Sequence, residues 1–292
     1  TQAGLGAGRD SSGNTATCST TIEVLDTISP SAKWQNNPYR LELDATGNAF
    51  VRPQDIDNGS TDNCGITNSF VNGMDSILYT CAGVGTTLVT LLVLDASGNL
   101  DSCRASIVVN DSISPIALCQ DTTVYLNSAG VASIQPNLID AGSSDNCSFI
   151  TSVNGAPSVN FNCNQLGMNT VQLIVIDAAG NAGQCTADVT LWDTIAPMAN
   201  CIGAGTLNVY LDNSCFVTIP ATTIDNGSTD NCSGPLTYTI GGLSNVTFNA
   251  TNLNTNPNTI SLSVEDIMGN SATCTTTIIV RDSIRPIAIC KN

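Results

Sequence analysis

Hydrophobic and polar residues alternate along short segments of this chain, with the period of two that is typical of half-buried β-strands. The clearest alternating segments cover residues 88–94, 171–176 and 260–264, and weaker ones cover 122–126 and 206–211. Turns rich in Asp, Asn and Gly follow them. Because no segment shows the period of an amphipathic helix, the pattern predicts an all-β protein.

A motif of the form Asp-x-Ile-x-Pro begins at Asp26, Asp111, Asp193 and Asp282, at spacings of 85, 82 and 89 residues. This period exceeds the roughly 20–50 residues of solenoid repeats and is close to the size of an immunoglobulin-like sandwich of about 100 residues. We therefore expect tandem immunoglobulin-like or fibronectin type III-like β-sandwiches in a linear array.

The expected domain boundaries follow from the motif. Residues 1–25 match only the C-terminal hairpin of a preceding repeat, and residues 282–292 match the first strand of a following repeat or a donated strand. Both ends predict continuation, either in a longer array or by exchange of strands between subunits. The three complete repeats are expected at residues 26–110, 111–192 and 193–281.

Charge excludes several classes of partner. The chain carries 24 Asp and Glu against 8 Lys and Arg, a net charge of −16, and it contains no histidine. Such a surface repels nucleic acid and anionic lipid. The lack of histidine removes Ser-His-Asp and Cys-His catalysis and the common zinc sites. No apolar run approaches the 18 residues of a membrane span, so we expect no membrane insertion in this segment.

Thirteen cysteines are dispersed along the chain without a C-x-x-C pair. This spacing gives no support to a zinc ribbon or a redox motif and favours disulfides in an oxidising compartment. We therefore expect a secreted or cell-surface protein.

Each complete repeat has an Asp before a Pro-containing segment, an Asp-x-x-Gly-Asn turn, and a cysteine a few residues later, which is Cys103, Cys185 or Cys274. These ordered motifs resemble the hyalin repeat (HYR) family of extracellular proteins. The resemblance implies immunoglobulin-like sandwiches used in adhesion or extracellular scaffolding and does not imply catalysis. The chain departs from the family's usual Cys-Pro pair, because Cys119, Cys201 and Cys290 have no following Pro and Trp34 stands in the equivalent place of the first repeat.

In a Greek-key sandwich of this kind, three Asp-bearing segments are expected to meet at the start of each repeat. Grouped carboxylates repel one another unless a cation compensates them, and Ca²⁺ accepts six to eight oxygen ligands from such loops. Each motif alone is also an ordinary turn, but 14 of the 21 Asp residues occupy repeated positions, which favours calcium. The predicted ligands are Asp26, Asp57, Asp62, Asp95 and Asn99; Asp111, Asp140, Asp145, Asp177 and Asn181; and Asp193, Asp225, Asp230, Asp266 and Asn270.

Cysteine positions predict two kinds of disulfide. The parallel first and seventh strands of a sandwich bring together Cys119 with Cys185 and Cys201 with Cys274. The remaining cysteines favour Cys64 with Cys81, Cys147 with Cys163 and, by elimination, Cys215 with Cys232. Cys103 is left as a buried free thiol or an intersubunit bond, and Cys18 and Cys290 belong to incomplete repeats.

Three functions compete. The leading hypothesis is a structural or adhesive array that is stapled by disulfides, stiffened by calcium and forms a stalk or filament. The alternative is a module on a cell surface that binds a glycan or a protein. It needs an exposed aromatic or loop cluster that is unique to one repeat, and with 4% aromatic residues the sequence shows none. An enzyme is the least favoured, because the paired Asp residues recur in every repeat.

Overall fold

The computed structural model describes residues 2–35, 37–204, 207–255 and 257–287. The chain packs as two compact units. One contains Thr1–Ile116, Ser144–Ile150 and Ile176–Gly183, and the other contains Ala117–Ser143, Thr151–Val175 and Gln184–Asn292. Cys290 lies outside the described residues. Among the residues described, helix is limited to single short turns, so the predicted all-β class is confirmed.

A hairpin comes first in the chain. Strands β1 (Gln2–Arg9) and β2 (Thr15–Ile22) pair antiparallel around a turn in which the Asp10 carboxylate accepts hydrogen bonds from the backbone of Ser12 and Asn14. The residues of β2 are exposed along its whole length.

The first repeat is an immunoglobulin-like sandwich of a four-stranded and a two-stranded sheet, ordered β3-β8-β7-β5 and β4-β6. Val51 from the two-stranded sheet packs with Val71, Leu91 and Ile107 from the four-stranded sheet in a single core. The elements are β3 (Tyr39–Glu42), β4 (Asn48–Val51), α1 (Pro53–Ile56), β5 (Ile66–Val71), β6 (Ile77–Thr80), a 3-10 turn η1 (Cys81–Gly83), β7 (Gly85–Asp95) and β8 (Leu100–Asn110).

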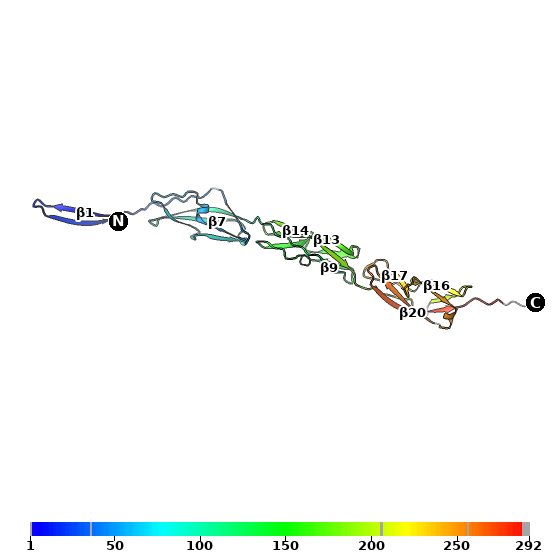
Figure 1. The fold of residues 1–292 in the computed structure, drawn as a ribbon. Coiled ribbons are helices and arrows are strands. Elements are labelled where there is room, and N and C mark those ends of the chain that lie inside the picture. Colours follow the sequence, from blue (N-terminus) through cyan, green and yellow to red (C-terminus); the bar gives the residue numbers. More distant parts are fainter. Residues whose placement is uncertain (1, 36, 205–206, 256, 288–292) are drawn as a thin grey trace, which may run out of the picture. The chain divides into compact units, whose positions relative to one another are not determined.

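The second repeat has the same strand order, β11-β13-β14-β9 with β10-β12. Its long strands β13 and β14 are coloured green in Figure 1. The elements are β9 (Thr122–Tyr125), β10 (Val131–Ile134), η2 (Pro136–Leu138), β11 (Phe149–Val153), β12 (Val159–Asn162), η3 (Cys163–Gln165), β13 (Gly167–Asp177) and β14 (Ala182–Trp192).

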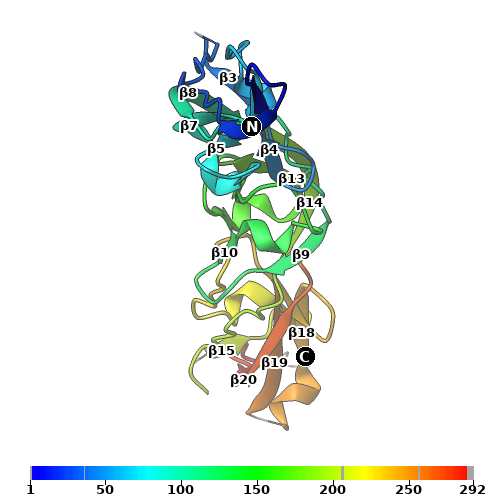
Figure 2. The ribbon, with the colours of Figure 1, turned by 90° about the vertical axis from the view of Figure 1, so that its left-hand side faces the viewer.

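The third repeat follows the pattern again, with sheets β15-β20-β19-β17 and β16-β18. Figure 2 shows β19 and β20 side by side, as their antiparallel register from Asn258↔Ile278 to Glu265↔Ser271 requires. The elements are β15 (Leu207–Tyr210), β16 (Phe216–Pro220), η4 (Ala221–Thr223), β17 (Thr237–Ile240), β18 (Asn245–Asn249), η5 (Ala250–Leu253), β19 (Asn258–Glu265) and β20 (Ser271–Arg281).

The first and last strands of each repeat are parallel neighbours, as the sandwich predicts. β3 pairs with β8 from Tyr39↔Ile107, and β9 and β15 pair in the same way with β14 and β20. The segment before each first strand contacts the Asp-rich loop through isolated bridges, for example Ser31↔Thr61. This contact brings the Asp-x-Ile-x-Pro motif to the loop.

Two disulfides join the segment before the first strand to the last strand. They are Cys119–Cys185 and Cys201–Cys274, the pairs that the parallel strands predict. In the first repeat Trp34 stands in place of the first cysteine, and Cys103 is a free, half-buried thiol packed with Trp34 against the core.

The other three expected pairs are wrong. The structure joins Cys81 to Cys147 and Cys163 to Cys232, and it leaves Cys64 and Cys215 free and exposed. The reason is visible in the first repeat. Cys64 precedes Ile66, which pairs with Asp95 at one end of β7, whereas Cys81 precedes Gly85 at the other end. An eleven-residue strand is about 33 Å long, far beyond the roughly 7 Å Cα separation of a disulfide.

Candidate calcium sites at the starts of the repeats

Three groups of acidic side chains are assembled at equivalent places. In each of the first two repeats the group consists of three Asp residues, and one carboxylate oxygen from each Asp lies within 4.8 Å of those of the other two. The first group is Asp26, Asp62 and Asp95, and the second is Asp111, Asp145 and Asp177.

Each carboxylate is positioned by its own turn. The Asp177 Oδ1 atom accepts a hydrogen bond from the Asn181 backbone at 2.8 Å, and the Asn181 side chain donates to Asp177 Oδ2 at 2.8 Å. The same amide donates to the Asp111 carbonyl oxygen at 3.0 Å. Asn99 and Asn270 make the corresponding bonds to Asp26 and Asp193. The Asp-x-x-Gly-Asn turn is therefore bonded to the Asp-x-Ile-x-Pro motif in all three repeats.

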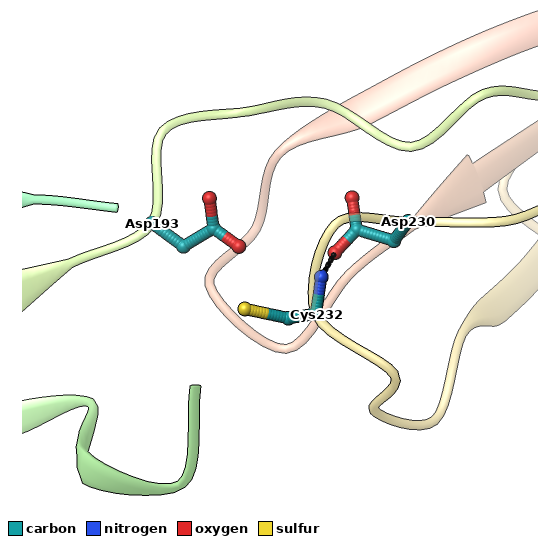
Figure 3. Close-up of side chains that lie close together, drawn as sticks. All are labelled: Asp193, Asp230 and Cys232. Atoms are coloured by element: carbon teal, nitrogen blue, oxygen red, sulfur yellow. Dashed lines mark hydrogen bonds between the residues drawn. The ribbon is translucent and has the colours of Figure 1, made fainter. Parts of the chain in front are cut away.

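The third group is Asp193 and Asp230, with Cys232 beside them. Figure 3 shows the carboxylates of Asp193 and Asp230, which come from two different loops, with the Cys232 N–H donating to Asp230 at 3.0 Å. Since the Cys232 sulfur is bonded to Cys163, it is not a thiolate available to a metal. The donor atoms that this group offers to a cation are therefore oxygen atoms, and Asp266 is close enough to act on Asp230 electrostatically.

In the third group, neighbouring negative charges oppose the ionised form of one carboxylate. Burial, and then the charges of Asp193 and Asp266, raise the pKa of Asp230 above its ordinary value, against the hydrogen bond from Cys232. At 4.8 Å, the upper limit for the oxygen atoms of a group, two full negative charges repel by about 1 kcal/mol in water and about 3.5 kcal/mol at an effective dielectric constant of 20. A bound cation removes this cost.

Five buried oxygen atoms in these loops have no hydrogen-bond partner among the described residues. They are Oδ1 of Asp62, Asp145, Asn146, Asp230 and Asn231. Buried polar oxygens without partners are uncommon and call for an explanation such as an ion or a water. All five lie in the Asp-Asn-Cys loop of a repeat, beside the acidic groups.

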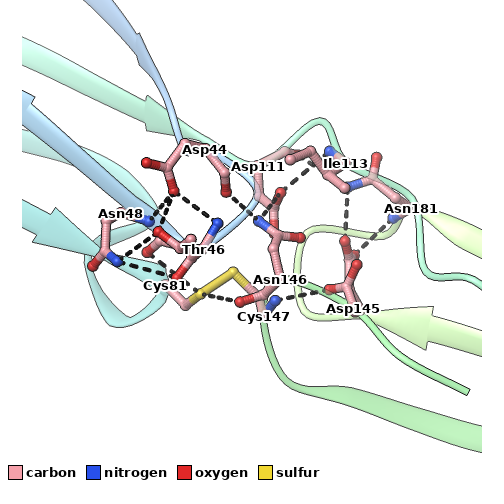
Figure 4. The surroundings of a disulfide bond; sticks show 12 residues. Asp44, Thr46, Asn48, Cys81, Asp111, Ile113, Asp145, Asn146, Cys147 and Asn181 are labelled. Atoms are coloured by element: carbon pink, nitrogen blue, oxygen red, sulfur yellow. Dashed lines mark hydrogen bonds between the residues drawn. A yellow bond between two sulfur atoms is a disulfide. The ribbon is translucent and has the colours of Figure 1, made fainter. Parts of the chain in front are cut away.

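Asn146 and Asn231 extend the predicted ligand set. The amide nitrogen of Asn146 donates to Asp111 Oδ1 at 3.1 Å and to the Asp44 carbonyl oxygen at 3.3 Å, which fixes its amide oxygen as the unpartnered atom (Figure 4). Asn231 has the same arrangement with Asp193. The repeated Asp-Asn-Cys triplet was the signal, but sequence reasoning assigned ligand roles only to its Asp.

Three predicted ligands are placed elsewhere. Asp57, Asp140 and Asp225 lie outside the acidic groups, each with an oxygen that accepts from the backbone and hydroxyl of the serine three residues later. For Asp140, burial raises the pKa, but the bonds from Ser143 outweigh it and hold the pKa below its usual value. These bonds close the loop turn, and the three residues are not members of the acidic groups.

Fold and site together define a tandem array of disulfide-linked immunoglobulin-like sandwiches with acidic loops at the start of each repeat. Over 305 aligned residues, 97% of this chain, the sequence is 27% identical to hyalin of Strongylocentrotus purpuratus, which supports the hyalin-repeat-like character of its motifs. The chain spans about a quarter of that relative, 24% of its length. No family model matches the chain.

Solved structures with related architecture include an I-band fragment of titin and a fragment of protocadherin gamma B2 with extracellular cadherin domains 1–5. The titin fragment has 10% identity and a TM-score of 0.42 over 88% of this chain and 100% of its own. The protocadherin has 11% identity and a TM-score of 0.33 over 96% of this chain and 65% of its own. Because both scores are below 0.5, the fold assignment rests on the strand order given above.

Proposed function

We propose that the protein is an extracellular structural or adhesive repeat protein whose consecutive repeats are held by disulfides and stiffened by calcium. The observation that carries the calcium proposal is the coincidence of buried, unpartnered oxygens with clustered carboxylates in the same loops. Such mixed oxygen donors suit Ca²⁺, whereas Mg²⁺ demands stricter octahedral geometry.

The residues that would hold the ion in the second repeat are Asp111, Asp145, Asp177 and Asn146. Asn146 also donates to the carbonyl oxygen of Asp44, which belongs to the first repeat. An ion held by Asn146 and Asp111 would therefore fix a loop that already contacts the preceding repeat. In this proposal calcium limits movement between consecutive repeats and supplies no catalytic chemistry.

Two observations support placement outside the cell, on a surface or in a filament. Four disulfides are formed, which is typical of oxidising compartments. The similarity to hyalin agrees with the resemblance of the motifs to the extracellular hyalin-repeat family. Among the residues that the structure covers, no helix has the length and apolarity needed to cross a bilayer.

Calcium titration by calorimetry tests the proposal. We expect three ions per chain, one for each acidic group, and a melting temperature that falls on chelation. At a calcium concentration 100 times the dissociation constant, one bound ion stabilises the folded state by about 2.7 kcal/mol.

D145N should remove one ion, while D140N, which alters an Asp outside the groups, should keep three. An unchanged melting temperature in excess chelator, or equal loss of binding in both variants, would contradict the proposal.

A further inference from the structure

The loop that supplies two of the proposed calcium ligands of the second repeat also carries a disulfide to the first repeat. Asp145, Asn146 and Cys147 are consecutive residues, and Cys147 is bonded to Cys81. The Cys147 N–H donates to Asp145 Oδ2 at 3.0 Å. Two ligands and a disulfide therefore share a segment of three residues, which Figure 4 shows.

The backbone of this loop is packed closely against the first repeat. The Cys81 sulfur lies 3.4 Å from the Asn146 carbonyl oxygen. A Cβ on Gly47 would lie 2.6 Å from the same oxygen and 2.7 Å from the Cys81 sulfur. The Asn146 amide nitrogen donates to the carbonyl oxygen of Asp44 at 3.3 Å. The disulfide and these contacts together restrain the residue whose amide oxygen is buried without a partner.

The third repeat has the same arrangement. Cys232 follows Asn231 and is bonded to Cys163 of the second repeat. A Cβ on Gly130 would lie 2.6 Å from the Asn231 carbonyl oxygen and 2.8 Å from the Cys163 sulfur. The Asn231 amide nitrogen donates to Asp193 Oδ1 at 3.1 Å, and its amide oxygen is buried without a partner. We call Cys81–Cys147 and Cys163–Cys232 the junction disulfides.

The first repeat has the same loop without a disulfide. Cys64 is a free, exposed thiol. Asn63 donates to Asp26 at 3.4 Å and is exposed, whereas Asn146 and Asn231 are half-buried and make this bond at 3.1 Å. The acidic group of the first repeat is nevertheless assembled. The acidic group therefore forms without the disulfide, while burial of the Asn amide accompanies the bond.

A covalent restraint on a binding loop changes its affinity for an ion. A loop that is already held in place loses less conformational entropy when it binds, so the disulfide should raise the affinity for calcium. Coupling between two equilibria is reciprocal. An ion that binds the disulfide-bonded loop more tightly than the reduced loop must therefore favour the disulfide over the two thiols to the same extent.

We propose that each junction disulfide and the calcium site of the repeat that follows it stabilise one another. The inference rests on the proposed calcium function and adds control by a reducing thiol. A dithiol such as dithiothreitol gives two electrons and two protons, the S–S bond breaks, each cysteine sulfur gains a proton, and the dithiol becomes a cyclic disulfide. Calcium then binds more weakly to the second and third repeats, and the first repeat is unaffected.

Equilibration of the purified 292-residue chain in mixtures of reduced and oxidised dithiothreitol tests the proposal. Alkylation and mass spectrometry give the reduced fraction of each disulfide. Saturating calcium, compared with chelator, should lower the ratio of reduced to oxidised junction disulfide by about 5–150-fold, the usual range of coupling between two sites. Cys119–Cys185 and Cys201–Cys274, which lie within single repeats, are internal controls and should change less.

Two asparagine variants, each checked for folding by circular dichroism, test whether the loop transmits the effect. N146A should abolish the calcium effect on Cys81–Cys147 and keep the effect on Cys163–Cys232. N63A makes the matched change in the loop that has no disulfide, and it should keep both effects.

Two disulfide variants test the reciprocal effect by calcium calorimetry. C81A/C147A should weaken binding at one site of three. C119A/C185A opens a loop of the same 66-residue separation within the second repeat and should leave the affinity of the folded chain unchanged. Equal weakening in both variants would contradict the proposal.

The outcomes distinguish this inference from the calcium function. Three bound ions with junction disulfides that are reduced equally in calcium and in chelator would overturn the inference and leave the calcium function intact. Equal protection of all four disulfides would also overturn it, because general stabilisation of the fold would then be the cause. Absence of calcium binding to the oxidised chain would overturn both.

Discussion

Removal of the Cys119–Cys185 disulfide should lower the free energy of unfolding by about 4 kcal/mol. The bond joins two cysteines that are 66 residues apart in the sequence. In the chain-entropy account, a closed loop of that size lowers the entropy of the unfolded chain by about 15 cal/mol/K, which is about 4.3 kcal/mol at 25 °C. The sulfurs lie between the segment before β9 and the strand β14, so their loss also frees a contact of the native sandwich.

The assay is urea denaturation of C119A/C185A, read by circular dichroism and by intrinsic fluorescence. Two controls isolate the cause. C64S removes a free exposed thiol and should leave the free energy unchanged. C81A/C147A opens a loop of the same 66-residue separation. The free energy of unfolding should therefore fall by a similar amount, because the entropy of the unfolded chain rises equally. A loss below about 1 kcal/mol in C119A/C185A, or one equal to that of C64S, would refute the reasoning.

Three further predictions concern the repeats. G130A should lower the melting temperature more than G142A, because both glycines have positive φ but only a Cβ on Gly130 would meet the Asn231 carbonyl oxygen at 2.6 Å; equal shifts would exclude this contact as the cause. N181A removes the donor to buried Asp177 and should cost about 1–3 kcal/mol in urea denaturation, and an unchanged free energy would contradict the bonding described. Burial raises the pKa of Asp177, but hydrogen bonds from Asn181 outweigh it, so the pKa is lower in the folded state than in the unfolded state. The ionised carboxylate therefore stabilises the fold at a pH above the unfolded pKa, and this stabilisation should be lost as the pH falls through the folded pKa. With chelator present, the melting temperature of D177N should depend less on pH in the acidic range than that of the unaltered chain. Identical pH profiles of the two proteins would disprove the assignment.

The strand pattern and the repeated motif were sufficient to predict the fold. Period-two alternation predicted the strand cores at residues 171–176 and 260–264, and the structure extends these strands to Gly167–Asp177 and Asn258–Glu265. Their ends could not be placed because the flanking residues, among them Gly167, Asn169 and Asn258, are mostly small or polar, and the one apolar side chain among them, Met168, is exposed. The parallel first and last strands likewise predicted Cys119–Cys185, since strand topology alone brings those two residues together.

The candidate sites were predictable only in part. Asp62 and Asp57 occupy the same loop and have the same chemistry, but Ser60 bonds Asp57 into a local turn and leaves Asp62 to face the acidic group. The disulfides between repeats were missed because sequence spacing does not reveal which end of the sandwich a cysteine occupies. Cys64 and Cys81 are close in sequence and lie at opposite ends of β7.

The overlap of the four disulfide loops sets a limit on how far the chain can be stretched. Between Cys81 and Cys274 the polypeptide runs 193 residues. The shortest covalent route follows the bonds and crosses only 28 residues, from Cys147 back to Cys119, and 16 more, from Cys185 to Cys201. At about 3.4 Å per residue, tension can extend these 44 residues to about 150 Å rather than about 650 Å. Residues before Cys81 have no such shortcut among the described disulfides, so the first repeat is the segment that yields length under load.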